Sequence, residues 1–252
     1  MNNINQEKNI ENATALHAAP HFPEVIPTNT CPQTLEELSR RSENFSAFSQ
    51  QVHLDVCDDV FAPGKSWPLL PEQQAELESM GIGPTRLPYV DVLSYEVHLM
   101  VKKPLSLGVA FARAGAKRVI PHVEVFPHAE NAREAFEMWR LSGAKEVGVA
   151  VLMDTPLSAL APYANICDEI LVMTIASVGK QGIPFDMRGV DRVRELHARY
   201  PRVTIAADGG VSEKNIALLR EAGVSRFCVG SAIEKKSDPA KAYANLLQAA
   251  GA

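Results

Sequence analysis

The stretch Ile205-Ala206-Ala207-Asp208-Gly209-Gly210-Val211 carries the pattern that decides the fold. A short apolar run ends there in a carboxylate and two glycines, and helical spacing of apolar residues follows at Ile216, Leu218 and Leu219. Near-continuous apolar runs are typical of parallel strands, because helices cover both faces of such a sheet. The stretch therefore predicts a buried parallel strand that ends in an acidic side chain and leads directly into a helix.

The same unit recurs along the chain. Seven further β-branched runs are Glu24–Ile26, Val52–Val56, Val97–Val101, Arg118–Val123, Glu146–Val151, Glu169–Met173 and Arg226–Val229, and Val203–Ala207 completes eight. Helical spacing lies between many of them, and glycines at 115, 143 and 223 stand where a left-handed helix cap is expected. Eight strands that alternate with helices predict a closed barrel or an open doubly wound sheet.

Domain organisation follows from length and local composition. A chain of 252 residues suits one (β/α)8 TIM barrel, which we expect over residues 23–252. Residues 1–22 lack a sustained apolar stripe and are interpreted as a flexible N-terminal extension. Residues 58–87 form a long loop, rich in proline, with at most one short helix at Glu72–Met80.

Composition excludes several classes of partner. The net charge of −5 argues against nucleic-acid binding, which requires a basic face. No stretch approaches the roughly 18 apolar residues of a membrane span. The four cysteines show no paired spacing, and the N-terminus has neither a signal-peptide nor a transit-peptide pattern, so we expect a cytoplasmic protein.

Four side chains at predicted strand ends form a candidate metal site. His53 and Asp55 stand two apart and share one face of their strand, while His98 and Asp208 belong to two other strands. Taken singly, each residue has an ordinary structural role. His98 could be a histidine of the core, and Asp208 could be the N-cap of the following helix. Together, two imidazoles and two carboxylates make a mixed nitrogen and oxygen set that suits Zn²⁺, Fe²⁺ or Mn²⁺.

Glycine turns after the last two strands suggest a phosphate site. Gly209 and Gly210 follow one strand, and Gly230 and Ser231 follow the next. In barrels, these two loops and a short helix often bind phosphate through backbone N–H groups, which need glycine for close approach. The alternative is that the glycines only form tight turns.

The motifs resemble those of the ribulose-phosphate 3-epimerase family over most of residues 52–247. His53-Leu54-Asp55-Val56-Cys57-Asp58 is similar to the family's H-x-D-x-M-D, and Val97-His98-Leu99-Met100-Val101 matches its third strand. His122-Val123-Glu124, Leu171-Val172-Met173-Thr174, Asp208-Gly209-Gly210-Val211 and Gly230-Ser231-Ala232-Ile233 resemble the later strands in order. The resemblance implies an isomerase of pentose phosphate and carbohydrate metabolism, and it carries over the same four metal ligands.

The chemistry implied is epimerisation at C3 of a phosphorylated ketose of the ribulose 5-phosphate and xylulose 5-phosphate type. Proton removal and return on opposite faces needs two acid/base groups, for which Asp55 and Asp208 are the candidates. The metal would act as a Lewis acid. Met100 and Met173 are interpreted as substrate contacts or plain core, His122 as a substrate contact or a structural residue, and Gly179 as part of the phosphate-binding lid.

Departures from the family pattern leave the substrate open. Near the end of the first strand, Thr30 or Cys31 takes the place of the family's serine, and the lid after the sixth strand reads Ala176-Ser177-Val178-Gly179-Lys180-Gln181-Gly182. Lys180 could contact phosphate or simply be solvated. The alternatives are an epimerase, aldolase or decarboxylase for another sugar phosphate, or a non-catalytic paralogue that binds metal or phosphate. We also expect a homo-oligomer, for which Phe61, Trp67 and Leu70 offer apolar surface unless they fold over the mouth.

Overall fold

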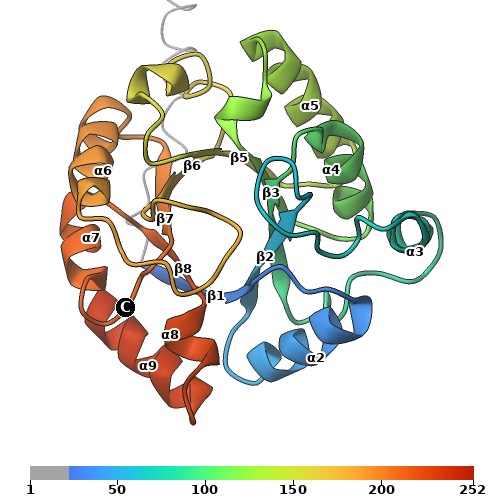
Figure 1. The fold of residues 1–252 in the computed structure, drawn as a ribbon, viewed down its shortest axis with the longest axis horizontal. Coiled ribbons are helices and arrows are strands. Elements are labelled where there is room, and N and C mark those ends of the chain that lie inside the picture. Colours follow the sequence, from blue (N-terminus) through green and yellow to red (C-terminus); the bar gives the residue numbers. More distant parts are fainter. Residues whose placement is uncertain (1–22) are drawn as a thin grey trace, which may run out of the picture.

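The computed structural model describes residues 23–252, so the predicted N-terminal extension, residues 1–22, lies outside the described residues. Eight parallel strands form a closed barrel, in which each strand pairs with the next and β8 pairs with β1 (Figure 1). This confirms the predicted (β/α)8 barrel. The strands are β1 (Glu24–Asn29), β2 (Gln51–Cys57), β3 (Ser94–Met100), β4 (Arg118–Pro121), β5 (Glu146–Val151), β6 (Glu169–Met173), β7 (Thr204–Asp208) and β8 (Arg226–Val229).

Helices surround the barrel on its outer side (Figure 1). They are α2 (Leu35–Ser46), α3 (Pro71–Ile82), α4 (Pro104–Arg113), α5 (Ala129–Leu141), α6 (Arg188–Arg199), α7 (Ile216–Ala222), α8 (Ser231–Glu234) and α9 (Pro239–Ala250). The link from β5 to β6 contains only a 3₁₀ turn, Leu157–Leu160. Within residues 23–252, no helix has the length and apolar character needed to cross a membrane.

Local sequence fixes the helix ends. The hydroxyl of Thr34 accepts a hydrogen bond from the Glu37 N–H, and Asp238 caps α9 through the Lys241 N–H. Gly223 ends α7 in the left-handed conformation, with φ of 118°, as its position predicts. Helix α7 is preceded by a turn rather than by a side-chain cap. Asn215 closes a turn by accepting from the Ser212 N–H and donating to the Gly210 carbonyl, so α7 begins at Ile216.

The long loop after β2 packs back on the barrel. Trp67 is completely buried, and its indole N–H donates to Glu76 of α3 at 2.8 Å. The ring of Phe61 lies 4.6 Å from that of His122. Two of the three residues considered for a subunit contact are therefore packed within this chain, and only Leu70 is exposed, at 41%.

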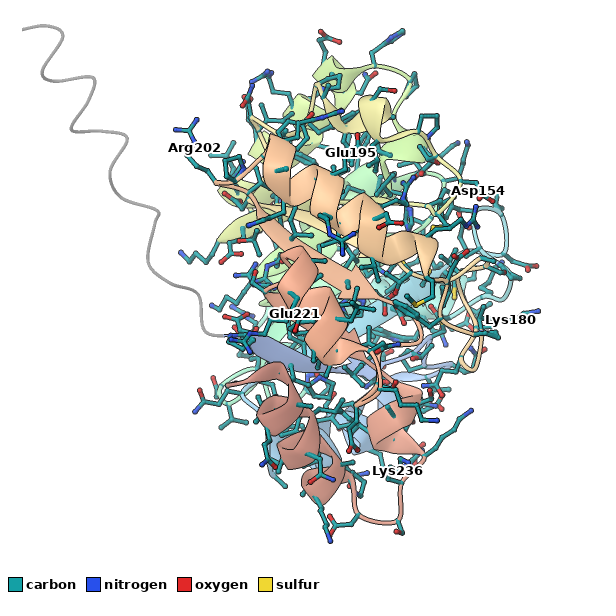
Figure 2. All side chains as sticks on the ribbon, turned by 90° about the vertical axis from the view of Figure 1, so that its left-hand side faces the viewer. Asp154, Lys180, Glu195, Arg202, Glu221 and Lys236 are labelled. Atoms are coloured by element: carbon teal, nitrogen blue, oxygen red, sulfur yellow. The ribbon has the colours of Figure 1, made fainter. Side chains whose placement is uncertain are left out.

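Alternate side chains along each strand face the barrel interior and fill it in levels. At the strand N-termini lies a set of linked charged residues, here called the ionic layer: Glu24, Glu96, Arg118, Glu146, Glu169 and Arg226. Apolar and sulfur-containing side chains, including Cys57, Met100 and Met173, cluster towards the strand C-termini. Figure 2 shows Asp154 and Lys180, which follow β5 and β6, at the opposite end of the barrel from Arg202, which precedes β7. The end that carries Asp154 and Lys180 is called the mouth.

Candidate active site

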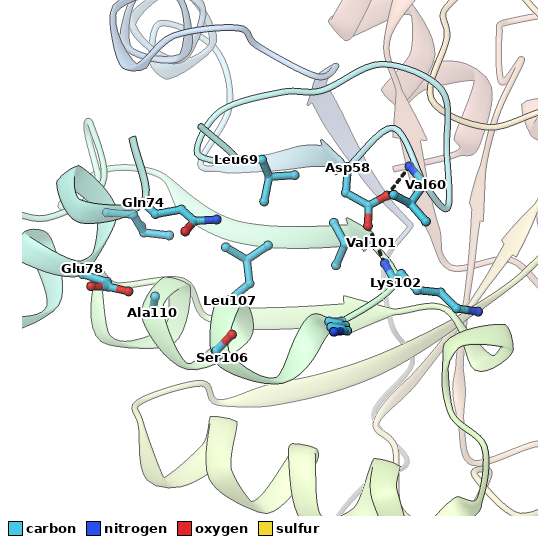
Figure 3. Close-up of a pocket in the computed structure, with 12 residues that line it drawn as sticks. Asp58, Val60, Leu69, Gln74, Glu78, Val101, Lys102, Ser106, Leu107 and Ala110 are labelled. Atoms are coloured by element: carbon cyan, nitrogen blue, oxygen red, sulfur yellow. Dashed lines mark hydrogen bonds between the residues drawn. The ribbon is translucent and has the colours of Figure 1, made fainter. Parts of the chain in front are cut away.

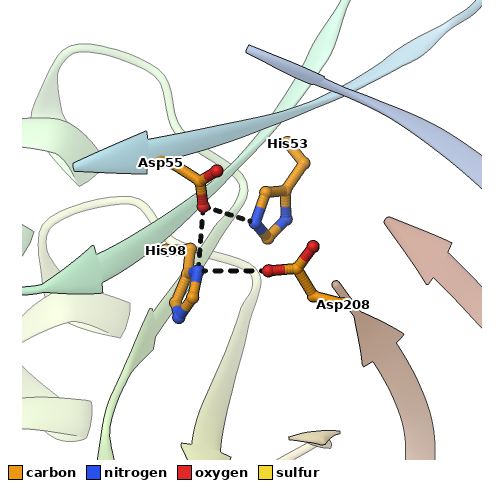
Figure 4. A group of neighbouring side chains, drawn as sticks. All are labelled: His53, Asp55, His98 and Asp208. Carbon is orange, nitrogen blue, oxygen red and sulfur yellow. Dashed lines mark hydrogen bonds and ion pairs between the residues drawn. The ribbon is translucent and has the colours of Figure 1, made fainter. Parts of the chain in front are cut away.

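His53, Asp55, His98 and Asp208 converge inside the barrel (Figure 4). Each offers one nitrogen or oxygen atom, and these atoms all lie within 4.8 Å of one another. Asp55 Oδ1 is 3.2 Å from His53 Nε2 and 3.0 Å from His98 Nδ1, and Asp208 Oδ2 is 3.9 Å from the same His98 nitrogen. The strands position them: the parallel pairing of β2 with β3 sets Asp55 opposite His98. We call this group the tetrad.

The tetrad fits a divalent cation. Ligands about 2.0–2.2 Å from a tetrahedral metal are separated from one another by roughly 3.3 Å, and the distances above lie around that value. The donor set of two imidazoles and two carboxylates suits a borderline metal such as Zn²⁺ or Fe²⁺ rather than Ca²⁺, which prefers oxygen ligands alone. The residues present can therefore hold such an ion.

The two carboxylates of the tetrad have opposite electrostatic surroundings. Burial, and then the charge of Asp55, raises the pKa of Asp208 to about 6. Burial also opposes ionisation of Asp55, but hydrogen bonds from His53 and His98 outweigh it and hold the pKa of Asp55 below its usual range. The metal-free site at neutral pH thus combines a firmly ionised Asp55 with an Asp208 close to its titration point.

His98 is linked to a second imidazole behind it. His98 Nε2 lies 2.9 Å from Nε2 of His122, and His122 Nδ1 lies 3.2 Å from a carboxylate oxygen of Glu124. Burial lowers the pKa of His122 to about 4, so this imidazole is neutral. If the Nδ1 lone pair of His98 faces the tetrad, its Nε2–H donates to His122, whose own Nδ1–H then donates to Glu124. Sequence reasoning missed this role of Glu124.

A small cavity of about 50 Å³ lies at the mouth beside the tetrad. Its walls include Asp55 and Asp208, together with the predicted substrate contacts Met100 and Met173. All five predicted phosphate-binding residues also line it: Gly179, Gly209, Gly210, Gly230 and Ser231. His122 is fully buried behind His98 and is not among the lining residues, so its predicted contact with substrate stays a prediction.

The glycines leave room that a side chain would fill. A Cβ at Gly210 would stand 2.8 Å from the backbone nitrogen of Phe185, and the residue has φ of 67°. This position therefore needs glycine for both its conformation and the close approach of the lid. Lys180 lines the cavity, and its side chain is exposed to solvent.

The first strand contributes a residue that sequence reasoning missed. Thr28 and Thr30 line the cavity, and the hydroxyl of Thr28 is buried without a hydrogen-bond partner among the described residues. The sequence signal for Thr28 was its spacing from Thr30. Side chains two residues apart on a strand point to the same face, so Thr28 should face the same cavity as Thr30. Cys31 is not among the lining residues, and its thiol donates to the carbonyl of Gly179 at 4.0 Å. The neighbouring thiol of Cys57, burial and the nearby Asp55 and Asp208 raise the pKa of Cys31, which makes it a poor nucleophile.

A larger groove of 410 Å³ lies outside the barrel, between the loop after β2 and helices α3 and α4 (Figure 3). Leu69, Leu77 and Leu107 line it, and the carboxylate of Asp58 accepts hydrogen bonds from the Val60 and Lys102 N–H groups at its edge. None of the predicted site residues lines this groove. The chemistry is therefore expected at the mouth, where titratable groups and glycine turns meet.

The family model and the relatives that match this chain point to the same family. The model of the ribulose-phosphate 3 epimerase family matches residues 31–234. Ribulose-phosphate 3-epimerase of Mycobacterium tuberculosis is 32% identical over 207 residues, which are 80% of this chain and 82% of that protein. Ribulose-phosphate 3-epimerase of Bacillus subtilis is 28% identical over 204 residues, covering 77% of this chain and 84% of the relative.

Solved structures support the fold independently. 3-Hexulose-6-phosphate synthase from Salmonella typhimurium superposes with a TM-score of 0.64 at 14% identity and covers 90% of this chain and 98% of its own. 3-Keto-L-gulonate-6-phosphate decarboxylase from Vibrio cholerae gives 0.66 at 12% identity, with 91% and 98% covered. At these identities the likeness concerns the barrel alone.

Proposed function

Because this chain belongs to the ribulose-phosphate 3-epimerase family, and is thus an isomerase, we propose that it epimerises C3 of a phosphorylated ketose of the ribulose 5-phosphate and xylulose 5-phosphate type. The observation that carries the proposal is the convergence of Asp55 and Asp208, from β2 and β7, on one cavity. Simple binding of a ligand does not require two acids there, whereas proton exchange on two faces of a carbon does.

The two acids, the two methionines and the metal have separate roles in the proposed reaction. Asp55 and Asp208, which border the cavity from β2 and β7, remove the proton from C3 and supply a proton to the opposite face of the enediolate. In the reverse direction the two carboxylates exchange roles. Met100 and Met173 border the reacting carbon and keep water away from it. A divalent ion held by the tetrad, Zn²⁺, Fe²⁺ or Mn²⁺, would supply Lewis acidity towards the substrate oxygens.

Phosphate binding is proposed at the glycine turns. Gly209 and Gly210 follow β7, Gly230 and Ser231 lead into α8, and Gly179 belongs to the lid; all border the same cavity as the two acids. Backbone N–H groups at such turns bind a phosphate without a basic side chain, which agrees with the acidic balance of the chain.

The test is exchange of the C3 proton with solvent. The protein loaded with Mn²⁺, Fe²⁺ or Zn²⁺ and given ribulose 5-phosphate in D₂O is expected to incorporate deuterium at C3, followed by NMR. Asp208→Asn and Asp55→Asn should each lower the rate by at least about 10²-fold, the size of a general acid or base contribution. Asp154→Asn, a surface acid at the mouth end with its side chain 77% exposed, is the matched control and should leave the rate unchanged. Exchange that persists in Asp208→Asn would remove that residue from proton transfer.

A second candidate is turnover of a different sugar phosphate on the same site. It is favoured by the lid, whose sequence departs from the family's pattern and from which Lys180 and Gln181 line the cavity. A panel of pentulose and hexulose phosphates, assayed for metal-dependent turnover, separates the two candidates. The cytoplasmic location stays a prediction from sequence.

Self-association is also proposed. Exposed apolar side chains gather on α3, α4 and α5: Ile82 at 85%, Leu105 at 44%, Met138 at 42% and Leu141 at 84%. Ile82, Leu105 and Met138 line one groove of 390 Å³. Glu78 and Arg113 stand at this groove, and patches that carry both charge signs can pair with their own copy across a two-fold axis. We expect a homo-oligomer in which this face is covered by a second copy.

A further inference from the structure

His53 contacts carboxylates through both ring nitrogens. Nε2 faces the tetrad, 3.2 Å from Asp55 Oδ1, whereas Nδ1 faces the other way, 2.5 Å from Oε1 of Glu96. Glu96 belongs to β3 two residues before His98, and the pairing of β2 with β3 sets it opposite His53. It is 2% exposed and takes no part in the tetrad, the cavity or the proposed proton transfer.

The carboxylate of Glu96 is held in place by Arg118 and Cys228. Its second oxygen, Oε2, accepts a short hydrogen bond from Nη1 of Arg118, and Oε1 also accepts from the thiol of Cys228 at 3.2 Å. Arg118 is in turn fixed by Glu146, 2.9 Å from its Nε, and by Glu169 at 3.6 Å. Each carboxylate oxygen of Glu96 therefore accepts a hydrogen bond from a residue other than His53, and these bonds fix the carboxylate in place.

The rest of the ionic layer prevents Arg118 from moving. Arg226 of β8 lies 2.6 Å from Glu169 and 2.8 Å from Glu146, and it also contacts Glu24 of β1 at 2.9 Å. Six strands, β1, β3, β4, β5, β6 and β8, thus contribute to one linked set near the strand N-termini. Burying this many charges inside a barrel is costly, and apolar residues would fill the space more cheaply. The cost of the ionic layer is explained if the layer serves to hold the carboxylate of Glu96 in one position.

We propose that Glu96, anchored by Arg118, is the positioning residue of the metal centre. It accepts the Nδ1–H of His53 and thereby fixes the ring tautomer and rotation that present the Nε2 lone pair to the tetrad. A carboxylate behind a ligating histidine typically changes metal affinity by 10–100-fold when it is removed. The proposal rests on the metal-dependent function proposed above, and the ionic layer is its structural support.

The ionic layer supplies a matched control. Glu169 is also fully buried and is bonded to both arginines, but it makes no contact with His53. Glu96→Gln and Glu169→Gln therefore each replace one buried carboxyl group of the same layer by an amide. Only Glu96→Gln changes the group that His53 Nδ1 meets.

The test measures Co²⁺ binding to the metal-free protein, with Co²⁺ as a spectroscopic probe. Affinity is measured against a competing chelator, ligand geometry from the Co²⁺ d–d absorption bands, and thermal unfolding reports the stability of each metal-free variant. We expect Glu169→Gln to bind within about 2-fold of wild type, and Glu96→Gln to bind about 10–100-fold more weakly with shifted bands. Equal affinity and identical bands in the two variants would overturn the proposal while the metal-dependent function stands. A wild-type protein that binds no divalent metal would overturn both.

Glu96→Asp covers the case in which Glu96→Gln does not fold. The shorter side chain keeps the charge for Arg118 but withdraws the oxygen from His53. It should again weaken Co²⁺ binding, and nitrogen NMR of His53 in the Zn²⁺-loaded protein should lose the single Nδ1–H tautomer. Unchanged affinity and an unchanged tautomer in Glu96→Asp would reject the positioning role.

Discussion

At the scale of single residues, two chemically identical carboxylates differ because of what surrounds them. Asp55 accepts hydrogen bonds from two imidazoles, which favour its ionised form, whereas Asp208 is buried near that negative charge. Residues that are electrostatically unfavourable in the resting protein are characteristic of functional sites, where stability is traded for activity. Asp208 fits that description better than any other member of the tetrad.

This asymmetry predicts opposite effects on stability. A pKa raised from 3.8 to about 6 means that the folded metal-free protein binds the Asp208 proton more tightly than the unfolded chain does. Its contribution is therefore fully present below about pH 4 and is lost as the pH rises through 6. Asp208→Asn should stabilise the metal-free protein at pH 8 by roughly 1–3 kcal/mol and should have little effect at pH 4.

Chemical denaturation at the two pH values measures the effect. Asp55→Asn serves as the contrast, because its pKa is lowered and its ionised form is the stabilising one, so that variant should be less stable than wild type at pH 8. Equal stability of wild type and Asp208→Asn at pH 8 would show that burial does not penalise this carboxylate.

At the scale of elements, the segment between β6 and α6 closes the mouth. The side-chain amide of Gln181 donates to the hydroxyl of Thr30, at 3.0 Å, and to Glu234 of α8, at 2.7 Å. This segment is therefore bonded to the end of β1 and to the helix that follows β8. Residues of this segment also line the cavity beside the tetrad, so opening of the segment would widen the access of a sugar phosphate to that cavity.

Gln181→Ala tests this closure. Loss of two side-chain hydrogen bonds, each worth about 1 kcal/mol, should favour the open segment in the free protein and make limited proteolysis at residues 176–186 roughly 5–30-fold faster. Ser177→Ala, at an exposed position of the same segment, is the control and should leave the cleavage rate unchanged. A wild-type cleavage rate in Gln181→Ala would mean that the two bonds do not hold the segment in place.

At the scale of the whole molecule, the barrel separates two surfaces with different roles. The mouth carries the acids and the glycine turns, while four exposed apolar residues lie on the flank formed by α3, α4 and α5: Ile82, Leu105, Met138 and Leu141. Large exposed side chains such as Ile82 and Leu141 are unfavourable in water and typically mark an interface. The active site and the proposed subunit contact are thus built from different parts of the fold.

Sedimentation measures the proposed assembly. The wild-type chain should sediment as an oligomer of 27.5 kDa units, and Ile82→Glu combined with Leu141→Glu should dissociate it. Met187→Glu, at an exposed apolar residue that precedes α6, is the control and should leave the assembly intact. A monomeric wild-type protein at micromolar concentration would contradict the proposal.

The sequence by itself determined the barrel and the identity of the four converging side chains. Strand composition, helix spacing and end signals such as Gly223 are local properties, so they can be read without knowing what a segment contacts. Side chains at the C-terminal ends of parallel strands must gather at one end of a closed barrel, which is why His53, Asp55, His98 and Asp208 could be grouped in advance. The start of α7 depends on one side chain, Asn215, which closes the turn before it, and no periodic pattern specifies that contact.

Only the tertiary structure decided what stands behind and beside those residues. His53 and Glu96 are 43 positions apart, and their contact depends on the register of β2 against β3, which no local pattern specifies. The pairing of His98 with His122, and of Gln181 with Thr30, depends in the same way on how strands and loops are staggered around the barrel. The sequence periodicity shows which side chains face inwards, whereas the stagger of the closed sheet sets the level at which they meet.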